Sequence, residues 1–302
     1  MKCDNTTITF ANQAIAQALQ FFDDAREVVI ISHMNADGDA VGSLLGSYHV
    51  LHCHYPTTHF QLILPNGCPK TFRWLPGSEF ILSGEHQKAE CLKALSDCDL
   101  ILGVDFNVAS RVDFLSDALS QSPAKKILCD HHHNPDGDLF NPLFSIADLS
   151  SCCELIHWFF RQLLGDDYLN EEAATCLYTG MSTDTGFCSY SCESPSLHFA
   201  MAAMLQYPIR AAEVYNHVMN TYSINRMRFW GFAISERLRI FEEKQFAYFY
   251  FSLEDQRRFG ITPQDMEGLV NYTLKMADIE AGALLREEEG RVKVSLRSKY
   301  TT

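Results

Sequence analysis

The chain has 302 residues, 47% of them hydrophobic and 21% charged, which is typical of a globular protein with room for two domains. Lysine and arginine number 24 against 38 acidic residues, which gives a formal net charge of −14. This charge excludes the basic stripe with which proteins bind long duplex DNA. A phosphate-bearing substrate should therefore be small, and bound metal should supply much of the neutralising charge.

No segment of the sequence is typical of a membrane span or an export signal. No run reaches the roughly eighteen apolar residues that a transmembrane helix needs, and residues 1–10 lack an apolar signal core. The eleven cysteines are scattered and form no C-x-x-C pair. We interpret them as reduced, buried thiols of a cytoplasmic protein that does not bind membranes.

The first half of the chain alternates short apolar runs with helical patterns. Residues 10–25 predict an amphipathic helix, and VVIIS (28–32) is a continuous apolar run that suits a buried parallel strand. Helical spacing resumes over 38–51. Further strands are predicted at 60–65, 100–104 and 126–129, and further helices at 150–164 and 171–178. The alternation favours an α/β domain over 1–194, with a parallel sheet covered by helices on both faces.

The remainder of the chain predicts a connector and a second domain. Long helical patterns at 195–219 and 225–241 carry no clustered acids or histidines, and we expect them to form a helical connector over 195–238. A smaller α/β domain is expected over 239–302. Its predicted elements are an aromatic strand at 246–251, a helix from Thr262 to about Met276, and a β-hairpin of 279–286 with 291–298.

Acidic residues and histidines gather in four clusters. These are His33 to Asp39, Asp105, Asp130 to His133, and Asp184. The first three clusters each begin where a predicted parallel strand ends. Because ligands bind outside the carboxyl ends of the strands in open α/β sheets, we expect these loops to converge on one pocket.

The side chains in these clusters are carboxylates and imidazoles without a thiolate, a set that suits manganese or magnesium better than a thiolate zinc site. Asp37 and Asp39 are spaced so that each could reach a different ion, and Asp105 could bridge the pair. Two neighbouring ions can stabilise both the attacking and the leaving oxygen of a phosphoryl displacement. A single aspartate after a strand is often only a helix N-cap, so the interpretation depends on the order and shared placement of the clusters.

The order HMNADGDAVGS, VDFNVASR, DHHH and TGMSTDTGF resembles the DHH phosphoesterase superfamily over roughly residues 28–190. SLRSK (295–299), which closes the predicted hairpin, resembles the start of the substrate-binding segment in the DHH-associated C-terminal domain. Within the superfamily the chain looks most like the bacterial oligoribonuclease/pAp phosphatases, or nanoRNases, which are related to exopolyphosphatases. The resemblance implies hydrolysis of very short RNA and of adenosine 3′,5′-bisphosphate (pAp).

The resemblance also implies a site for two Mn²⁺ ions, with Mg²⁺ or Co²⁺ as possible substitutes. The first ion would be held by His33, Asp37 and Asp105, and the second by Asp39, Asp105, His131 and Asp184. Asp130 would orient His131, as carboxylates commonly do for ligating imidazoles. His132 would face the scissile phosphate as a hydrogen-bond donor or general acid, so that His132 and Asp105 are the expected catalytic residues.

Substrate contacts are implied for Arg111, after the second motif, and for Arg297 and Ser298 in the second domain. In the family, SLRS is followed by a glycine-rich stretch that ends in His and grips substrate, whereas this sequence ends at 302. We therefore expect the second domain to be truncated and substrate to bind more weakly than in an extended form. Cys188 and Ser189 also stand where many relatives have an arginine.

Alternative activities use the same metal ligands. They are a cyclic- or linear-dinucleotide phosphodiesterase, an exopolyphosphatase and a family II-type pyrophosphatase. The SLRS hairpin favours the oligoribonuclease group. A non-catalytic nucleotide sensor is the alternative from another class, but such a protein would be expected to lose metal ligands. The expected partners are short RNA or nucleotide substrates, not long duplex DNA, and the chain could form a homodimer.

Overall fold

The computed structural model describes residues 7–299, and the chain divides into two compact units, Met1–Val218 and Met219–Thr302. The expected connector at 195–238 is therefore split between the two units, and the boundary differs from those predicted at 194 and 239. Packing explains the difference. Leu197 and Met204 are buried in the core of the first unit, whereas Phe229 and Trp230 are buried in the core of the second. Residues 300–302, where the sequence departs from the glycine-rich stretch of the family, lie outside the described residues, so the expected truncation of the second domain stays a prediction.

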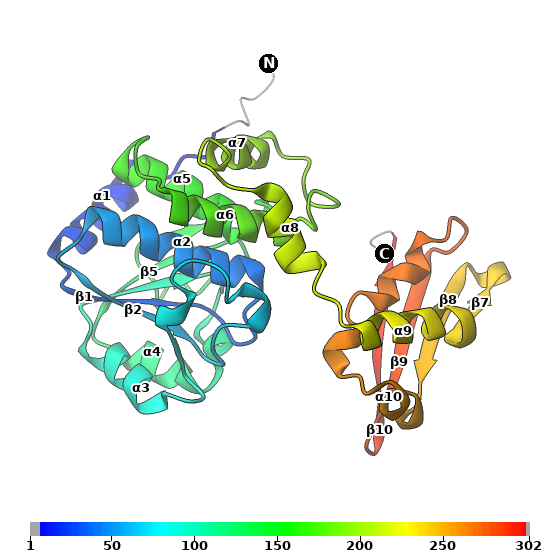
Figure 1. Cartoon of the computed structure of the whole chain (residues 1–302). Helices are drawn as coiled ribbons and strands as arrows, with labels where there is room; N and C mark the ends of the chain where they lie inside the picture. The colour runs from blue at the N-terminus through cyan, green and yellow to red at the C-terminus, as the bar shows by residue number, and fades with distance from the viewer. Residues whose placement is uncertain (1–6, 300–302) are drawn as a thin grey trace. The chain divides into compact units, whose positions relative to one another are not determined.

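A six-stranded sheet forms the centre of the first unit (Figure 1). Its strands are β1 (Glu27–Ile31), β2 (His59–Leu64), β3 (Ile81–Ser83), β4 (Leu100–Val104), β5 (Lys125–Asp130) and β6 (Leu143–Ser145). Their order is β3-β2-β1-β4-β5-β6, and every neighbouring pair is parallel. The four predicted strands are confirmed. The chain builds outward from β1 in one direction and then returns to β1's other side at β4, so β1 and β4 form the topological switch point.

Helices cover both faces of this sheet, as predicted (Figure 1). The helices are α1 (Asn12–Asp24), α2 (Gly38–His54), α3 (Lys88–Asp97), α4 (Ser116–Gln121), α5 (Cys152–Leu164), α6 (Glu171–Asp184), α7 (Pro195–Met204) and α8 (Ala211–Met219). One core lies under α1, α2, α5 and α6, and the other lies under α3 and α4. The prediction of one long helix at 195–219 is wrong. The chain leaves helical geometry after Met204, and Pro208 precedes the next helix.

The second unit contains a four-stranded mixed sheet in the order β10-β9-β8-β7. Its elements are α9 (Ile224–Phe232), β7 (Leu238–Phe241), β8 (Phe246–Phe251), α10 (Leu253–Phe259), β9 (Ala281–Glu288) and β10 (Arg291–Ser298). The aromatic strand and the hairpin are confirmed, with Arg291 paired to Glu288 in antiparallel register. The predicted helix at 225–241 instead ends in a π-helical turn (Ala233–Arg237) and then becomes β7.

The helix predicted from Thr262 to Met276 is replaced by two short 3₁₀ helices, Pro263–Met266 and Leu269–Lys275. Gly268 separates them with a φ of 82°, a left-handed conformation that suits glycine. Within residues 7–299, no helix is both long and apolar enough to cross a membrane. The cysteines in that range are free thiols, but the prediction that they are buried is wrong for Cys53 and Cys188, which are exposed.

Candidate metal centre

The predicted clusters converge at the carboxyl edge of the sheet, at its switch point. One residue separates His33 from the end of β1. Asp105 immediately follows β4, and Asp130 is the last residue of β5. Asp105 has a positive φ of 61°, unusual for a residue other than glycine, and its backbone N–H donates to the carbonyl oxygen of Cys129 at 3.0 Å. Such local strain is common where a side chain must be aimed into a functional site.

The first group of potential metal ligands is formed by His33, Asp37 and Asp105. His33 Nε2 lies 3.4 Å from Asp105 Oδ2, while its Nδ1 lies 2.9 Å from the carbonyl oxygen of Met34. A carbonyl can only accept, so Nδ1 carries a proton, and Nε2 is the nitrogen that is directed at the carboxylates. Asp37 caps α2, because its Oδ1 accepts hydrogen bonds from the N–H groups of Asp39 and Ala40. Its other oxygen remains available to a cation.

The second group is formed by Asp39, His131 and Asp184. His131 Nε2 lies 3.7 Å from Asp39 Oδ2 and 3.7 Å from Asp184 Oδ2. The other ring nitrogen of His131 lies 3.2 Å from the carbonyl oxygen of Leu149, which it satisfies as a donor. His33 and His131 thus direct the same nitrogen, Nε2, at the acids, and this is the atom through which each imidazole could bind a metal.

Asp105 belongs to the first group and also forms a third group with His131 and His132, so it links the first group to His131 of the second. One of its oxygens lies 3.4 Å from His33 Nε2, and the other, Oδ1, lies 3.5 Å from His131 Nε2. This Oδ1 is fully buried and has no hydrogen-bond partner among the described residues. A buried carboxylate oxygen without a donor is costly, and a bound cation would offset that cost. The donor set of carboxylates and imidazoles fits Mn²⁺ or Mg²⁺.

The pKa values of the acids also reflect this crowding of negative charge. Burial, followed by the charges of Asp39 and Asp37, raises the pKa of Asp105 well above its usual range. Burial and then the charge of Asp39 raise the pKa of Asp184 to about 7, although His131 opposes the shift. Burial also raises the pKa of Asp39. The acids repel one another in the absence of positive charge, and divalent ions would remove that repulsion.

The start of α5 fixes the orientation of Asp39. Asp39 Oδ2 accepts a hydrogen bond of 2.6 Å from the N–H of Cys152, and Oδ1 accepts one of 2.9 Å from the N–H of Cys153. Ser151 caps the helix by accepting from the N–H of Glu154. This role of the backbone was not predicted from the sequence. The Ser-x-x-Glu spacing of Ser151 and Glu154 is a helix-start signal that locates these N–H groups.

The hydrogen-bond partner of Asp130 in the structure is His132, not His131 as expected. The Asp130 carboxylate contacts His132, through a 2.7 Å bond to Nδ1 and a 3.0 Å bond from the backbone N–H, whereas His131 bonds to Leu149. The chain turns after β5. This turn brings His132 back toward the carboxylate of Asp130 and explains the change of partner. The hydrogen bond to Asp130 raises the pKa of His132, whose side chain is about one-third exposed.

The predicted substrate residues are distributed over both units. Arg111 is exposed and lies in the short helix Ala109–Leu115, and its charge opposes the rise in the pKa of His132. Its backbone carbonyl accepts from the N–H of Met34, which ties this helix to the loop after β1. Arg297 and Ser298 lie on β10 in the second unit. Their contact with substrate stays a prediction.

A parallel sheet with an Asp- and His-lined centre at its switch point is an arrangement that suits a metal-dependent enzyme of the α/β class. Residues 27–181, more than half of the chain, match the family described as "DHH family, N-terminal domain". The chain therefore belongs to the DHH family of phosphoesterases, which confirms the resemblance seen in its motifs.

Similar proteins agree with this assignment. The bifunctional oligoribonuclease and PAP phosphatase NrnA of Bacillus subtilis (strain 168) is 28% identical over 90% of this chain and 81% of its own length. The crystal structure of an exopolyphosphatase-related protein from Bacteroides fragilis is 33% identical and superposes with a TM-score of 0.91, covering 97% of this chain and 85% of that one. The exonuclease RecJ bound to manganese shares the fold alone, with 14% identity, a TM-score of 0.50, and coverage of 96% and 83%.

Proposed function

We propose that the protein is a manganese-dependent phosphoesterase that hydrolyses short oligoribonucleotides and pAp. The observation that carries the proposal is the position of Asp105, whose two oxygens face the two ligand groups and one of which is buried without a donor. The similarity to NrnA of B. subtilis over 90% of the chain supports the substrate class. The net charge of −14 favours small substrates over long nucleic acid.

The proposed ligands of one ion are His33, Asp37 and Asp105, and those of the other are Asp39, Asp105, His131 and Asp184. The ions would supply positive charge against the phosphate oxygens and Lewis acidity at the reacting phosphorus. Mn²⁺ is the ion named for RecJ, which has the same fold. Mg²⁺ and Co²⁺ are further candidates for the same oxygen- and nitrogen-rich sites.

His132 is proposed to hold and deliver the proton for the leaving oxygen. Its Nδ1 is engaged by Asp130 at 2.7 Å, which leaves Nε2–H as the donor on the exposed side of the ring. The hydrogen bond to Asp130 favours the protonated imidazole, as a general acid requires. Arg111, which is close enough to influence the His132 pKa, is proposed to bind a substrate phosphate oxygen.

Arg297 and Ser298 are proposed to bind the terminal nucleotide or phosphate from the second unit. The side chains that alternate with Arg297 along β10, Lys293 and Ser295, line a cavity with it and with Arg286. Lys293 and Arg297 beside a hydroxyl suit phosphate, although Arg286 is paired with Glu288 and Glu267 also lines the cavity. Exopolyphosphatase activity is the second candidate, because the Bacteroides fragilis relative is described as exopolyphosphatase-related.

A parallel assay distinguishes these activities. Hydrolysis of pAp, a diribonucleotide, cyclic di-AMP, polyphosphate and pyrophosphate is measured in Mn²⁺, with Asp105→Asn as the inactive control. The proposal expects the highest kcat/KM on pAp or the diribonucleotide. A clear preference for polyphosphate or pyrophosphate would transfer the assignment to that substrate, and equal rates in Asp105→Asn would contradict catalysis at this centre.

A further inference from the structure

Glu154 is a fully buried acid that belongs to none of the groups of potential metal ligands. It lies in the first turn of α5, the helix whose Cys152 and Cys153 N–H groups hold the carboxylate of Asp39. A carboxylate is rarely buried so completely unless its oxygens are hydrogen-bonded, because the loss of hydration is costly. The partners of Glu154 therefore indicate what this residue does in the fold.

One oxygen of Glu154 fixes the segment that leads into α5. Its Oε2 accepts hydrogen bonds from the N–H of Ser150 at 3.1 Å and from the hydroxyl of Ser150 at 2.7 Å. Ser151 in turn caps the helix by accepting from the N–H of Glu154 at 3.0 Å. These reciprocal bonds hold the first turn of α5 in one conformation and leave the N–H groups of Cys152 and Cys153 to meet Asp39.

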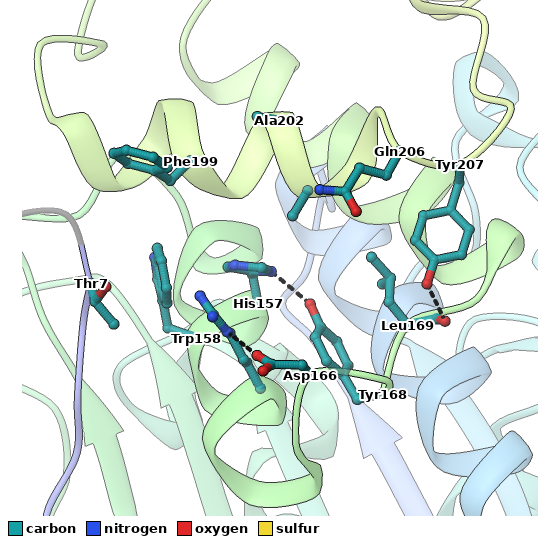
Figure 2. Close-up of a pocket in the computed structure, with 12 residues that line it drawn as sticks. Thr7, His157, Trp158, Asp166, Tyr168, Leu169, Phe199, Ala202, Gln206 and Tyr207 are labelled. Atoms are coloured by element: carbon teal, nitrogen blue, oxygen red, sulfur yellow. Dashed lines mark hydrogen bonds and ion pairs between the residues drawn. The ribbon is translucent and has the colours of Figure 1, made fainter.

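The other oxygen of Glu154 joins α5 to α7. Its Oε1 accepts a hydrogen bond of 2.5 Å from the hydroxyl of Ser196, which is fully buried at the start of α7. Further along the two helices, a cavity of about 520 Å³ lies between them, lined by His157 of α5 and Phe199 of α7 among others (Figure 2). The bond from Ser196 therefore fixes the helices to each other at the end of α5 that contacts Asp39.

We propose that Glu154 is a positioning residue for the metal centre, which holds the first turn of α5 where its N–H groups orient Asp39. This role depends on the metal centre of the proposed function but not on its substrates. Asp39 belongs to the second group of ligands and not to the first. Among the described residues, no hydrogen bond joins His33, Asp37 or Asp105 to α5. Loss of Glu154 should therefore affect one ion more than the other.

Calorimetric titration of the full chain with Mn²⁺ tests this role without use of the catalytic activity. Glu154→Leu keeps a side chain of similar size but offers no acceptor to Ser150 and Ser196. It should weaken the ion that Asp184→Asn also weakens roughly five- to tenfold, and the other ion less than about twofold. In Glu154→Gln the amide oxygen can accept from Ser150 while the amide N–H₂ donates to Ser196, so Mn²⁺ affinity should return to within about threefold of wild type.

Tyr168→Phe is the matched control for a loss of stability alone. It removes the buried hydrogen bond of 2.6 Å between the Tyr168 hydroxyl and His157 Nδ1, three residues beyond Glu154 on α5, which a dashed line marks in Figure 2. Both Tyr168→Phe and Glu154→Leu should unfold at lower denaturant concentration than wild type in EDTA. Only Glu154→Leu should lose Mn²⁺ affinity, because only its bonds hold the turn that contacts Asp39.

Ser196→Ala removes only the link to α7 and tests the role even where Glu154→Leu does not fold. It should weaken the same ion about threefold. Wild-type Mn²⁺ affinity in folded Glu154→Leu or in Ser196→Ala would overturn the role of Glu154. Equal weakening of both ions, or the same weakening in Tyr168→Phe, would also overturn it. A wild-type chain that binds no Mn²⁺ would overturn the metal centre itself and this role with it.

Discussion

Asp39 and Cys152 are joined by a 2.6 Å hydrogen bond from the backbone N–H of Cys152 to Asp39 Oδ2, across 113 positions of sequence. Because the N–H of Cys153 occupies the other oxygen, the carboxylate is held by the first turn of α5 before any cation arrives. Helix N-termini favour anions through their free N–H groups and the helix dipole. The geometry of one metal group therefore depends on how closely α5 packs against α2 and α6.

Substitution of Gly180 in α6 tests this dependence. A Cβ at this position would lie 2.2 Å from Cys153 Sγ and 3.0 Å from Asp39 Oδ1, so α5 or Asp39 must move. We expect Gly180→Ala to reduce Mn²⁺ affinity and kcat/KM by at least about tenfold, as is typical of lost support for a metal ligand. Gly231→Ala is the control, since nothing lies within 4 Å of its added Cβ, and it should retain both properties. Wild-type Mn²⁺ affinity in Gly180→Ala would contradict the role of this packing.

The neighbouring histidines are expected to respond differently to removal. His131 Nε2 faces three acids, whereas His132 is bonded to Asp130. His131→Ala should therefore weaken Mn²⁺ binding and turnover together, and His132→Ala should lower kcat by about 10²–10⁴-fold with nearly unchanged Mn²⁺ affinity. Metal titration and steady-state kinetics on pAp measure both effects. Equal loss of metal in the two variants would refute the division of roles.

The pH profile should depend on Asp130. The hydrogen bond from His132 to this carboxylate raises the His132 pKa, so Asp130→Asn lowers it. If protonated His132 is the general acid, the basic limb of the kcat profile should move to lower pH in the variant. The profile is measured between pH 5 and 10 at saturating Mn²⁺, in steps of about 0.5. An unmoved basic limb would show that His132 does not supply the proton.

The metal-free protein should lose stability as the pH rises. The pKa of Asp184 is about 7 in the folded chain against an ordinary value of 3.8, so between these values the folded state binds a proton that the unfolded state has released. The free energy of unfolding then falls as pH rises through about 4 to 7. Denaturant titrations in EDTA should show this slope, and Asp184→Asn should flatten it. Stability that instead increases across the window in wild-type protein would contradict the repulsion among these acids.

The arrangement of the site was predictable from sequence because it depends on strand ends. The apolar runs at 28–32, 100–104 and 126–129 are parallel strands, so His33, Asp105 and His131 necessarily reach one edge of the sheet. Hydrogen-bond partners were less predictable. The turn after β5 decides whether Asp130 bonds to His131 or to His132. The hydrophobic periodicity of the sequence does not predict the geometry of that turn.

The division of the chain was predicted less well, because it depends on packing between elements. Helical spacing identifies α7 and α9 but does not specify which core each one joins. The strands β3 and β6 have three residues each, too few for a periodic pattern. The contact of α5 with Asp39 is made by backbone N–H groups, so the sequence marks only the start of the helix, through Ser151 and Glu154, and not its partner.

The number of Mn²⁺ ions bound per chain, in wild type and in Asp105→Asn, tests the shared role of Asp105 most directly. Asp105 faces both ligand groups, with Oδ2 at 3.4 Å from His33 and Oδ1 at 3.5 Å from His131. Equilibrium dialysis with elemental analysis should find two ions in the wild-type chain and strongly weakened binding at both sites in the variant, while His33→Ala weakens mainly one. A single ion in the wild type that Asp105→Asn still binds with full affinity would contradict the two-metal centre.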